Sequence, residues 1–231
     1  MWRIVDSGPA TAEENMAIDC QLLKTLGQEK GGVLHFYEWS APSATYGHFI
    51  QPAQFLHLGE LAKRGISLAK RPTGGGIVFH VSDFAFSLLI PSHHPAFSLN
   101  TLENYAFVNR IVSDVIAQFS GGCVLPSLLV QESECVEKAF LKFCMAKPTV
   151  YDVMVGNRKV GGAAQRRTKE GFLHQGTISL LVPPRELLES VLMSSRLPEA
   201  MHSQSYSLIS SVVELPEARK RLKELLTQRV G

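Results

Sequence analysis

The sequence predicts an α+β fold in which a mostly antiparallel sheet is packed with helices. Strand-like apolar runs are joined by short turn signals, and helical segments interrupt them at irregular intervals. The clearest turn is Gly156-Asn157, a two-residue hairpin signal between residues 153–155 and 158–160. No strand–helix–strand alternation is visible.

Three segments carry helical periodicity. The first begins after Thr11, an N-cap residue that forms a capping box with Glu14, and Gly27 ends it. The last has several basic residues on its outer face, which we expect to be solvated. The helices are predicted at residues 12–26, 102–119 and 216–229.

Strand-like segments fill most of the remaining chain. Residues 127–142 alternate charged and apolar side chains and are interpreted as a mobile insertion. No internal repeat or low-complexity linker divides the chain, so we expect a single domain over residues 1–231. The strands are predicted at residues 33–39, 66–70, 77–80, 84–90, 150–155 and 172–182.

The composition excludes several classes of protein. Hydrophobic residues make up 45% of the 231 and charged residues 19%, which supplies a core. A net charge of +2 is too balanced for binding nucleic acid through a general electrostatic field. No apolar run approaches the roughly 18 residues of a membrane span, and Asp6 interrupts any signal peptide. Four cysteines without a C-x-x-C pair indicate a reducing cytoplasm and no structural metal site.

The stretch KRPTGGGIVFH at residues 70–80 is the first candidate site. Three consecutive glycines expose main-chain N–H groups and let a ligand approach the main chain closely. Lys70 and Arg71 are able to meet an anion, and His80 follows the loop. An ordinary hairpin loop is the alternative. The pattern is not a Walker loop, a dinucleotide fingerprint or a hydrolase elbow.

The second candidate is VMVGNRKVGGAAQRR at residues 153–167. Lys159 falls just after the hairpin turn and just before Gly161-Gly162. This is a crowded place for a long side chain unless that side chain reaches into a pocket. An exposed hairpin lysine is the alternative interpretation.

These motifs occur in one order with three others. WRIVDSG at residues 2–8, NMAID at 15–19 and FYEW at 36–39 precede the glycine loop, and HQGT at 174–177 follows the hairpin. Over residues 2–182 the chain therefore resembles the lipoate–protein ligase and octanoyltransferase family. That family shares its catalytic domain with biotin–protein ligases.

The resemblance implies the biotin/lipoate-ligase catalytic domain, with a mixed, mostly antiparallel curved sheet. The implied reaction transfers a lipoyl or octanoyl group to a lysine of a lipoyl domain, on a 2-oxoacid dehydrogenase E2 or on the glycine-cleavage H protein. The family's catalytic lysine maps onto Lys159. Its acyl chain needs an apolar slot, for which Val78, Phe79 and Phe86 are candidates that suit a plain core equally well. The implied substrate-binding or acyl-adenylate-binding residues are Lys70, Arg71, Thr73, Gly74, Gly75, Gly76, Val78, His80, Asp152, Gly161 and Ala163.

Of the two chemistries in this family, we expect an ATP-dependent ligase. ATP and Mg²⁺ would convert lipoate or octanoate into an acyl-adenylate, whose carboxylate and phosphate Lys159 would neutralise. Asp152 matches a position where ligases carry Asn-Asp, and Gly76 stands where the resembling transferases often have arginine. Magnesium is held largely by phosphates and water, so no protein ligand is named for it.

The alternative is ATP-independent acyl transfer through Cys144. CMAKPTVYD at residues 144–152 resembles the C-F-x-x-P-S-x-Y-E pattern of cysteine octanoyltransferases, with conservative departures at Met145, Thr149 and Asp152. The cysteine would take octanoate from an acyl-carrier-protein thioester, and a nearby Lys159 ammonium would favour the thiolate. A buried, inert cysteine is the structural alternative.

The length after the last motif fits either chemistry. About 50 residues remain, so the C-terminal accessory domain of about 100 residues that many ligases carry is not expected. A non-catalytic relative that only binds lipoyl domains is a third possibility, which the retained Lys159 and glycine triplet disfavour. Arg166, Arg167 and Lys169 are candidates to meet an acidic lipoyl domain, or are ordinary solvated charges.

Overall fold

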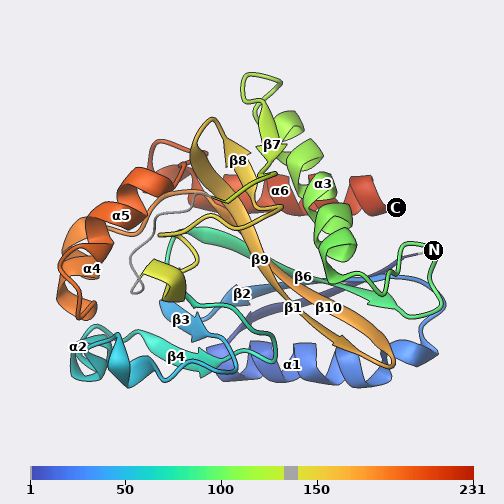
Figure 1. The fold of residues 1–231 in the computed structure, drawn as a ribbon, viewed down its shortest axis with the longest axis horizontal. Helices are drawn as coiled ribbons and strands as arrows, with labels where there is room; N and C mark the ends of the chain where they lie inside the picture. The colour runs from blue at the N-terminus through green and yellow to red at the C-terminus, as the bar shows by residue number, and fades with distance from the viewer. Residues whose placement is uncertain (1, 133–139) are drawn as a thin grey trace.

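The computed structural model describes residues 2–132 and 140–231, and within them ten strands form two sheets (Figure 1). The larger sheet has seven strands in the order β1-β2-β6-β10-β9-β8-β7, and the smaller has the order β4-β3-β5. The larger sheet consists of β1 (Arg3–Ala10), β2 (Val33–Trp39), β6 (Asp83–Pro91), β7 (Pro126–Leu128), β8 (Val153–Val155), β9 (Arg158–Thr168) and β10 (Gly171–Ser179). The smaller consists of β3 (Ser43–Tyr46), β4 (Ser67–Lys70) and β5 (Ile77–His80).

Most neighbouring strands are antiparallel, as predicted, but two pairs are parallel. β1 pairs in parallel with β2, and β3 with β4. A helix connects the strands of each parallel pair, α1 (Ala12–Thr25) in the first and α2 (Leu58–Lys63) in the second. Two strand–helix–strand units are therefore present, although no such alternation is visible in the sequence. β1 is hard to predict because its register shifts between Asp6 and Pro9, and β3 because it has four residues.

Helices cover both faces of the larger sheet. In Figure 1, α1 lies below the sheet, while α3 (Thr101–Phe119) and α6 (Leu215–Val230) lie above it. The Thr11–Glu14 capping box predicted for α1 is present in both directions. The main core lies between the sheet and the α3–α6 pair, and includes Phe86, Phe172 and Leu222. All three predicted helices are confirmed to within one residue at each end.

A second core lies on the smaller sheet. It joins α2 to two helices that were not predicted, α4 (Arg185–Val191) and α5 (Leu197–Gln204). Phe79 and Phe143 are buried in it. Across residues 2–132 and 140–231, no helix combines the length and apolar character that a membrane crossing requires.

Two predicted strand limits are wrong. β8 begins at Val153 instead of residue 150, because residues 149–152 form a turn in which Tyr151 has φ 68°. β10 ends at Ser179, three residues early. The segment 127–142, interpreted as an insertion, contains the end of β7 and a 3-10 turn at Phe140–Lys142. Its residues 133–139 lie outside the described part of the chain.

Candidate active site

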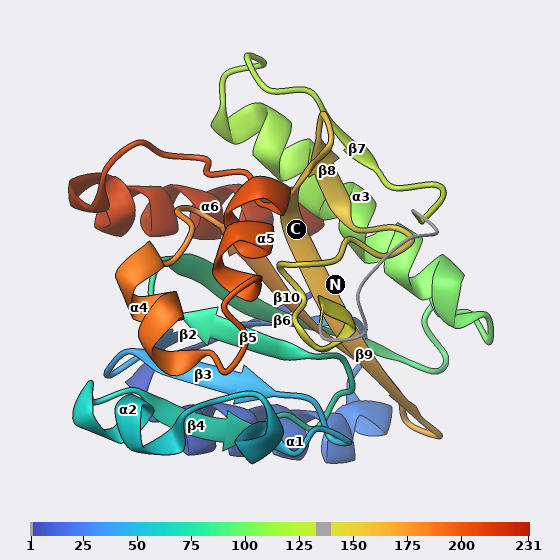
Figure 2. The same ribbon diagram turned by 60° about the vertical axis from the view of Figure 1, so that its left-hand side comes forward.

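Residues of both sheets, which lie side by side in Figure 2, line a pocket. Its walls come from β2, β9 and β10 of the larger sheet, β3 and β5 of the smaller, α1, and the segments that carry Arg71 and Cys144. These elements are distant in the sequence and come together only in the folded protein. The lining residues are Met16, Tyr37, Trp39, Thr45, Arg71, Val78, His80, Cys144, Gly162, Ala163, Ala164, Gln175, Gly176 and Thr177.

Arg71 is a buried cation in this lining, with 5% of its surface exposed. Its Nη1 donates to the main-chain oxygen of Thr45 at 3.0 Å and to Thr45 Oγ1 at 2.8 Å. Its Nη2 donates to the main-chain oxygens of Gly74 at 3.1 Å and Gly76 at 2.7 Å. All four acceptors are neutral oxygens. Within residues 2–132 and 140–231 no carboxylate forms an ion pair with Arg71, so its charge is solvated but not neutralised there.

The glycine loop binds Arg71 through its main-chain carbonyl oxygens. Gly74 and Gly76 turn their main-chain oxygens toward the guanidinium, and the binding of an anion by N–H groups of this loop stays a prediction. Gly75 has φ +81°, a left-handed conformation that L side chains rarely adopt. The loop is thus shaped around a cation supplied by its own chain.

Cys144 stands at the pocket beside this loop. Its N–H donates to the oxygen of Ile77 at 3.4 Å, and the preceding Phe143 forms a bridge with Ile77. The chain just before Cys144 passes directly over Gly76, where a Cβ would lie 2.3 Å from the oxygen of Lys142. Glycine is therefore required at position 76 by the approach of the cysteine segment. That reason holds for either chemistry, so Gly76 does not favour a ligase.

Lys159 and Asp152 form a buried ion pair near the same segment. Lys159 is 3% exposed, and its Nζ lies 2.7 Å from Asp152 Oδ2. The same Nζ donates to the main-chain oxygen of Cys144 at 2.9 Å. Asp152 Oδ2 also accepts from the N–H and Oγ1 of Thr149. A Cβ on Gly162 would lie 2.3 Å from Lys159 Cε, so this glycine leaves space for the inward-turned lysine.

Aromatic and hydrogen-bonded groups, among them Trp39, His80 and Thr177, form another part of the lining. His80 Nε2 lies 2.7 Å from Thr45 Oγ1, and His80 Nδ1 lies 2.7 Å from Asp83 Oδ2. Thr177 Oγ1 donates to the same carboxylate oxygen at 2.6 Å. Burial raises the pKa of Asp83, but the contacts with His80 and Thr177 outweigh it and hold this pKa below its usual value. Trp39 stacks on His80 with ring centroids 4.2 Å apart.

Gln175 on β10 is held in place by a buried polar network. Its Nε2 donates to Asp19 Oδ2 at 2.6 Å, and its Oε1 accepts from Thr73 Oγ1 at 2.7 Å. Asp19 is bound in turn by His35 at 2.8 Å and by Ser87 at 2.6 Å. Thr73, a predicted substrate-binding residue, therefore contacts Gln175 and does not itself line the pocket.

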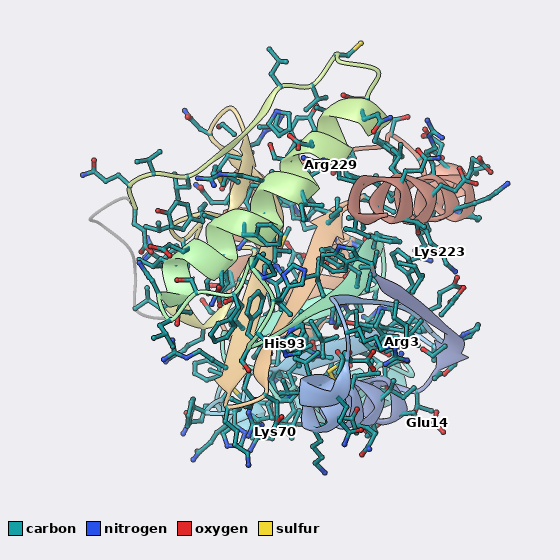
Figure 3. All side chains as sticks on the ribbon, turned by 90° about the vertical axis from the view of Figure 1, so that its right-hand side faces the viewer. Arg3, Glu14, Lys70, His93, Lys223 and Arg229 are labelled. Carbon is teal, nitrogen blue, oxygen red and sulfur yellow. The ribbon has the colours of Figure 1, made fainter. Side chains whose placement is uncertain are left out.

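The predicted site residues divide into three groups. Arg71, Val78, His80, Cys144 and Ala163 line the pocket. The remaining positions near it are Thr73, Gly74, Gly75, Gly76, Asp152, Lys159 and Gly161, which support residues of the lining or pack behind it. Lys70 is exposed at the end of β4 and is not part of the lining (Figure 3). Phe79 and Phe86, proposed for an acyl slot, belong instead to the two cores.

Residues 11–224 match the family model described as the lipoyl protein ligase A/B catalytic domain. The chain belongs to this family. Among curated relatives, octanoyltransferase LipM of Bacillus subtilis (strain 168) is 30% identical over 237 residues, which cover 96% of this chain and 84% of that protein. Octanoyltransferase LipM of Geobacillus kaustophilus (strain HTA426) is 31% identical over 197 residues, which cover 83% of this chain and 69% of that protein.

Solved structures show the fold of the lipoyl protein ligase A/B catalytic domain. Lipoate-protein ligase A bound with ATP superposes with a TM-score of 0.71 at 22% identity, covering 99% of this chain and 85% of that one. Protein Ta0514 from T. acidophilum with bound lipoic acid gives a TM-score of 0.70 at 20% identity, covering 100% of this chain and 86% of that one. The predicted family and fold class are confirmed.

Sequence reasoning missed several lining residues of this family member. Trp39 and Gln175 stand in motifs that carried the resemblance, FYEW and HQGT, but neither was assigned to the site. Met16 stands in a third such motif, NMAID, and was not assigned either, whereas Thr45 gave no signal, since an isolated threonine is common in any core. Their assignment depends on how the two sheets pack against each other, which spacing along the chain does not specify.

Proposed function

We propose that the chain is an octanoyltransferase that moves an acyl group from a thioester donor, through Cys144, to a lysine of a lipoyl domain. The observation that carries the proposal is the position of Cys144 in the pocket lining, with its main chain held by Ile77 and Lys159. A thiolate there is a nucleophile suited to thioester exchange. The octanoyltransferase names of relatives about 30% identical support the same chemistry.

The proposed reaction has two steps that need no cofactor. In the first, Cys144 Sγ attacks the thioester carbonyl, the bond from carbon to the donor sulfur breaks, and the donor leaves as a thiol after taking a proton. In the second, the uncharged amine of the target lysine attacks the acyl-enzyme. A carbon–nitrogen bond forms, the bond to Sγ breaks with its electron pair returning to sulfur, and the amine proton is lost to solvent.

The ATP-dependent ligase expected from the sequence has less support than this alternative. Gly76 has a packing reason that does not involve ATP, and Asp152 is the partner of Lys159. The two solved structures described above are 20% and 22% identical to this chain and carry information on the fold alone. ATP and Mg²⁺ therefore stay a prediction of the less supported mechanism.

The partners proposed follow from this chemistry. The donor is an octanoyl thioester on an acyl-carrier protein, and the acceptor is a lipoyl domain of a 2-oxoacid dehydrogenase E2 or the glycine-cleavage H protein. Arg166 and Arg167 are exposed on β9, and Arg166 Nη1 donates to the oxygen of Pro72 at 3.4 Å, beside the glycine loop. A basic surface at this place suits an acidic domain.

The experiment offers one purified protein two sets of substrates. One set is octanoyl-acyl-carrier protein with an apo lipoyl domain and no nucleotide; the other is free octanoate or lipoate with ATP, Mg²⁺ and the same domain. We expect one octanoyl group on the lipoyl domain from the thioester set, and a transient octanoyl group on Cys144. Intact-protein mass spectrometry measures both.

Cys144→Ala is the decisive variant. It is expected to retain less than a thousandth of the transfer rate, because removal of a covalent nucleophile leaves only binding and electrostatic stabilisation. Product that forms from the free acid and ATP, and persists in Cys144→Ala, would instead establish the ligase.

A further inference from the structure

Two buried cations lie next to Cys144, and each is a candidate to stabilise a thiolate. Lys159 comes from β9 and Arg71 from the segment after β4. The sequence favoured Lys159, because the family's lysine maps there. The structure separates the two by what each cation contacts.

The charge of Lys159 already has a partner. Its Nζ lies 2.7 Å from Asp152 Oδ2, and the carboxylate and the ammonium are both almost fully buried. Its other bond goes to the main-chain oxygen of Cys144, not to the sulfur. The lysine is also absent from the pocket lining that contains Cys144. A neutralised cation bound to a main-chain oxygen holds the cysteine segment in place but offers the sulfur little net field.

The guanidinium of Arg71 faces the sulfur across Gly75. A Cβ on Gly75 would lie 3.3 Å from Arg71 Nη2 and 3.8 Å from Cys144 Sγ, so both groups border the same small space. Arg71 and Cys144 both line the pocket. The four hydrogen bonds of the guanidinium go to neutral oxygens, which leave its full charge in a buried site.

Cys144 and two tyrosines are the acidic groups that lie around Arg71. Burial lowers the pKa of the guanidinium, and ionised Cys144, Tyr37 and Tyr105 would each raise it. Burial, however, raises the pKa of Tyr37 on β2 well above its usual value and that of Tyr105 on α3 to about 12. Both phenols therefore keep their protons near neutral pH.

The other titratable groups nearby have partners of their own. Asp152 is engaged by Lys159. His80 on β5 lies between Thr45 and Asp83. The carboxylates of Asp152 and Asp83 thus pair with groups other than Arg71, so of the acidic groups near the guanidinium the thiol remains.

We propose that Arg71 is the counter-ion of the Cys144 thiolate, and that Lys159 is a positioning residue that holds the main chain of Cys144. Ionisation breaks the S–H bond, leaves the electron pair on Sγ beside the guanidinium and passes the proton to solvent. This assignment rests on the proposed function, in which the thiolate is the nucleophile. It concerns which cation stabilises the Cys144 thiolate, so it can be tested without measuring acyl transfer.

The test is the rate at which iodoacetamide alkylates Cys144, followed by peptide mass spectrometry from pH 6 to pH 10. Arg71→Gln removes the charge, Arg71→Lys keeps it, and the double variant Lys159→Gln/Asp152→Asn removes the other cation without leaving an unpaired buried carboxylate. Exposed Cys123 is alkylated in the same tube and reports the reagent. Thermal unfolding checks that each variant is folded.

At pH 7, we expect alkylation of Cys144 in Arg71→Gln to slow about tenfold, the effect of losing one nearby opposite charge. The rate should return to the wild-type value at high pH, where the thiol ionises unaided. Arg71→Lys should keep most of the rate. If Arg71→Gln does not fold, this variant still tests the effect of the charge at position 71. The double variant should keep the wild-type pH profile.

Three results would overturn the assignment. They are an unchanged rate in Arg71→Gln, a slow rate that high pH does not restore, and a slowed, pH-restored rate in the double variant. Acyl transfer is scored separately with octanoyl-acyl-carrier protein. If wild-type protein forms no octanoyl-Cys144, the proposed function fails, whereas the alkylation profiles still decide which cation faces the sulfur.

Discussion

Lys159 and Arg71 are both buried, yet the protein surrounds their charges differently. Lys159 has a carboxylate 2.7 Å away, whereas Arg71 is bound by the oxygens of Thr45, Gly74 and Gly76. Burying a charge is unfavourable unless hydrogen bonds or an opposite charge replace the lost water. The carboxylate of Asp152 offsets the charge of Lys159, whereas the oxygens of the glycine loop replace water around the charge of Arg71.

On the proposed assignment, this difference separates a structural cation, Lys159, from a reactive one, Arg71. A cancelled charge stabilises the positions of the groups that form the pair, here Asp152 and the main chain of Cys144. A charge solvated by neutral oxygens stays available to an anion that forms during a reaction. Two buried cations beside the same cysteine can therefore have separate tasks, and substitutions should affect them in different ways.

The largest effect is expected from Lys159→Met. The change leaves the Asp152 carboxylate buried without its ammonium, and such unpaired buried charges typically lower the free energy of unfolding by about 3–5 kcal/mol. Urea unfolding followed by fluorescence measures the loss. Lys159→Met/Asp152→Asn should recover part of it, because no charge is then left unpaired and the oxygen of the new amide can still accept from Thr149.

An exposed ion pair of the same length is the control. Lys63 Nζ lies 2.7 Å from Glu60 Oε1 on α2, but both side chains are solvated. Lys63→Met should leave the free energy of unfolding unchanged within error. If Lys159→Met behaves in the same way, burial of the Lys159–Asp152 pair does not contribute as argued.

Gly76→Ala tests the loop whose main-chain oxygens bind Arg71. The added methyl group would meet main-chain atoms of Lys142 at 2.3 Å and 2.5 Å, so the cysteine segment or the loop must shift. We expect a loss of about 2 kcal/mol in the free energy of unfolding, as for other overpacked sites. Acylation of Cys144 should slow at least tenfold, because the sulfur and Arg71 both move.

Gly74→Ala provides the matched control two positions earlier. A Cβ on Gly74 would have no neighbouring heavy atom within 4 Å. The same chemical change there should alter neither stability nor acylation measurably. Equal effects of Gly74→Ala and Gly76→Ala would mean that the loop responds to any loss of glycine, and that the close approach of Lys142 is not the cause.

Local signals in the sequence predicted the parts of this site that depend on local geometry. The Thr11–Glu14 pair placed α1, and the two glycines after Lys159 indicated an inward side chain, as the contact with Gly162 shows. Such features are determined by a few neighbouring residues. They are readable without knowledge of the rest of the fold.

Other features depend on contacts across the fold and were not readable. Nothing near Gly76 in the sequence indicates that the chain at Lys142 crosses over it, so on sequence alone this glycine favours a ligase. The sequence also gives no sign that oxygens of Thr45 on β3 and of the glycine loop surround Arg71, and the anion expected at Arg71 stays a prediction. β1 and β3 were missed because parallel pairing with β2 and β4 leaves little trace in short or irregular strands.

A third buried base extends the comparison of Lys159 and Arg71. His174 on β10 is fully buried, and its Nδ1 lies 2.8 Å from Gln165 Nε2. Its Nε2 has no hydrogen-bond partner in the part of the chain that the structure describes. With neither a carboxylate nor a set of oxygens, this base does not keep a charge: burial lowers the pKa of His174 to about 3.

This base makes stability depend on pH in a predictable direction. The pKa of His174 lies below its usual 6.5 in the folded protein, so the unfolded chain binds the proton more readily. Stability should therefore be greatest above pH 6.5 and fall as the pH drops toward 3. Between pH 6.5 and 5.5 this residue alone should lower the free energy of unfolding by about 1 kcal/mol.

His174→Gln removes the titrating group and isolates its contribution. The variant should be less stable than the wild type at pH 8 but should lose about 1 kcal/mol less on acidification to pH 5.5. Urea unfolding at the two pH values measures the difference, and exposed His57→Gln is the control for loss of any imidazole. Equal acid sensitivity in His174→Gln and wild type would show that a partner for the imidazolium exists. The rule that separates Lys159 from Arg71, that a buried base keeps its charge only where the chain supplies a carboxylate or several oxygens, would then not extend to His174.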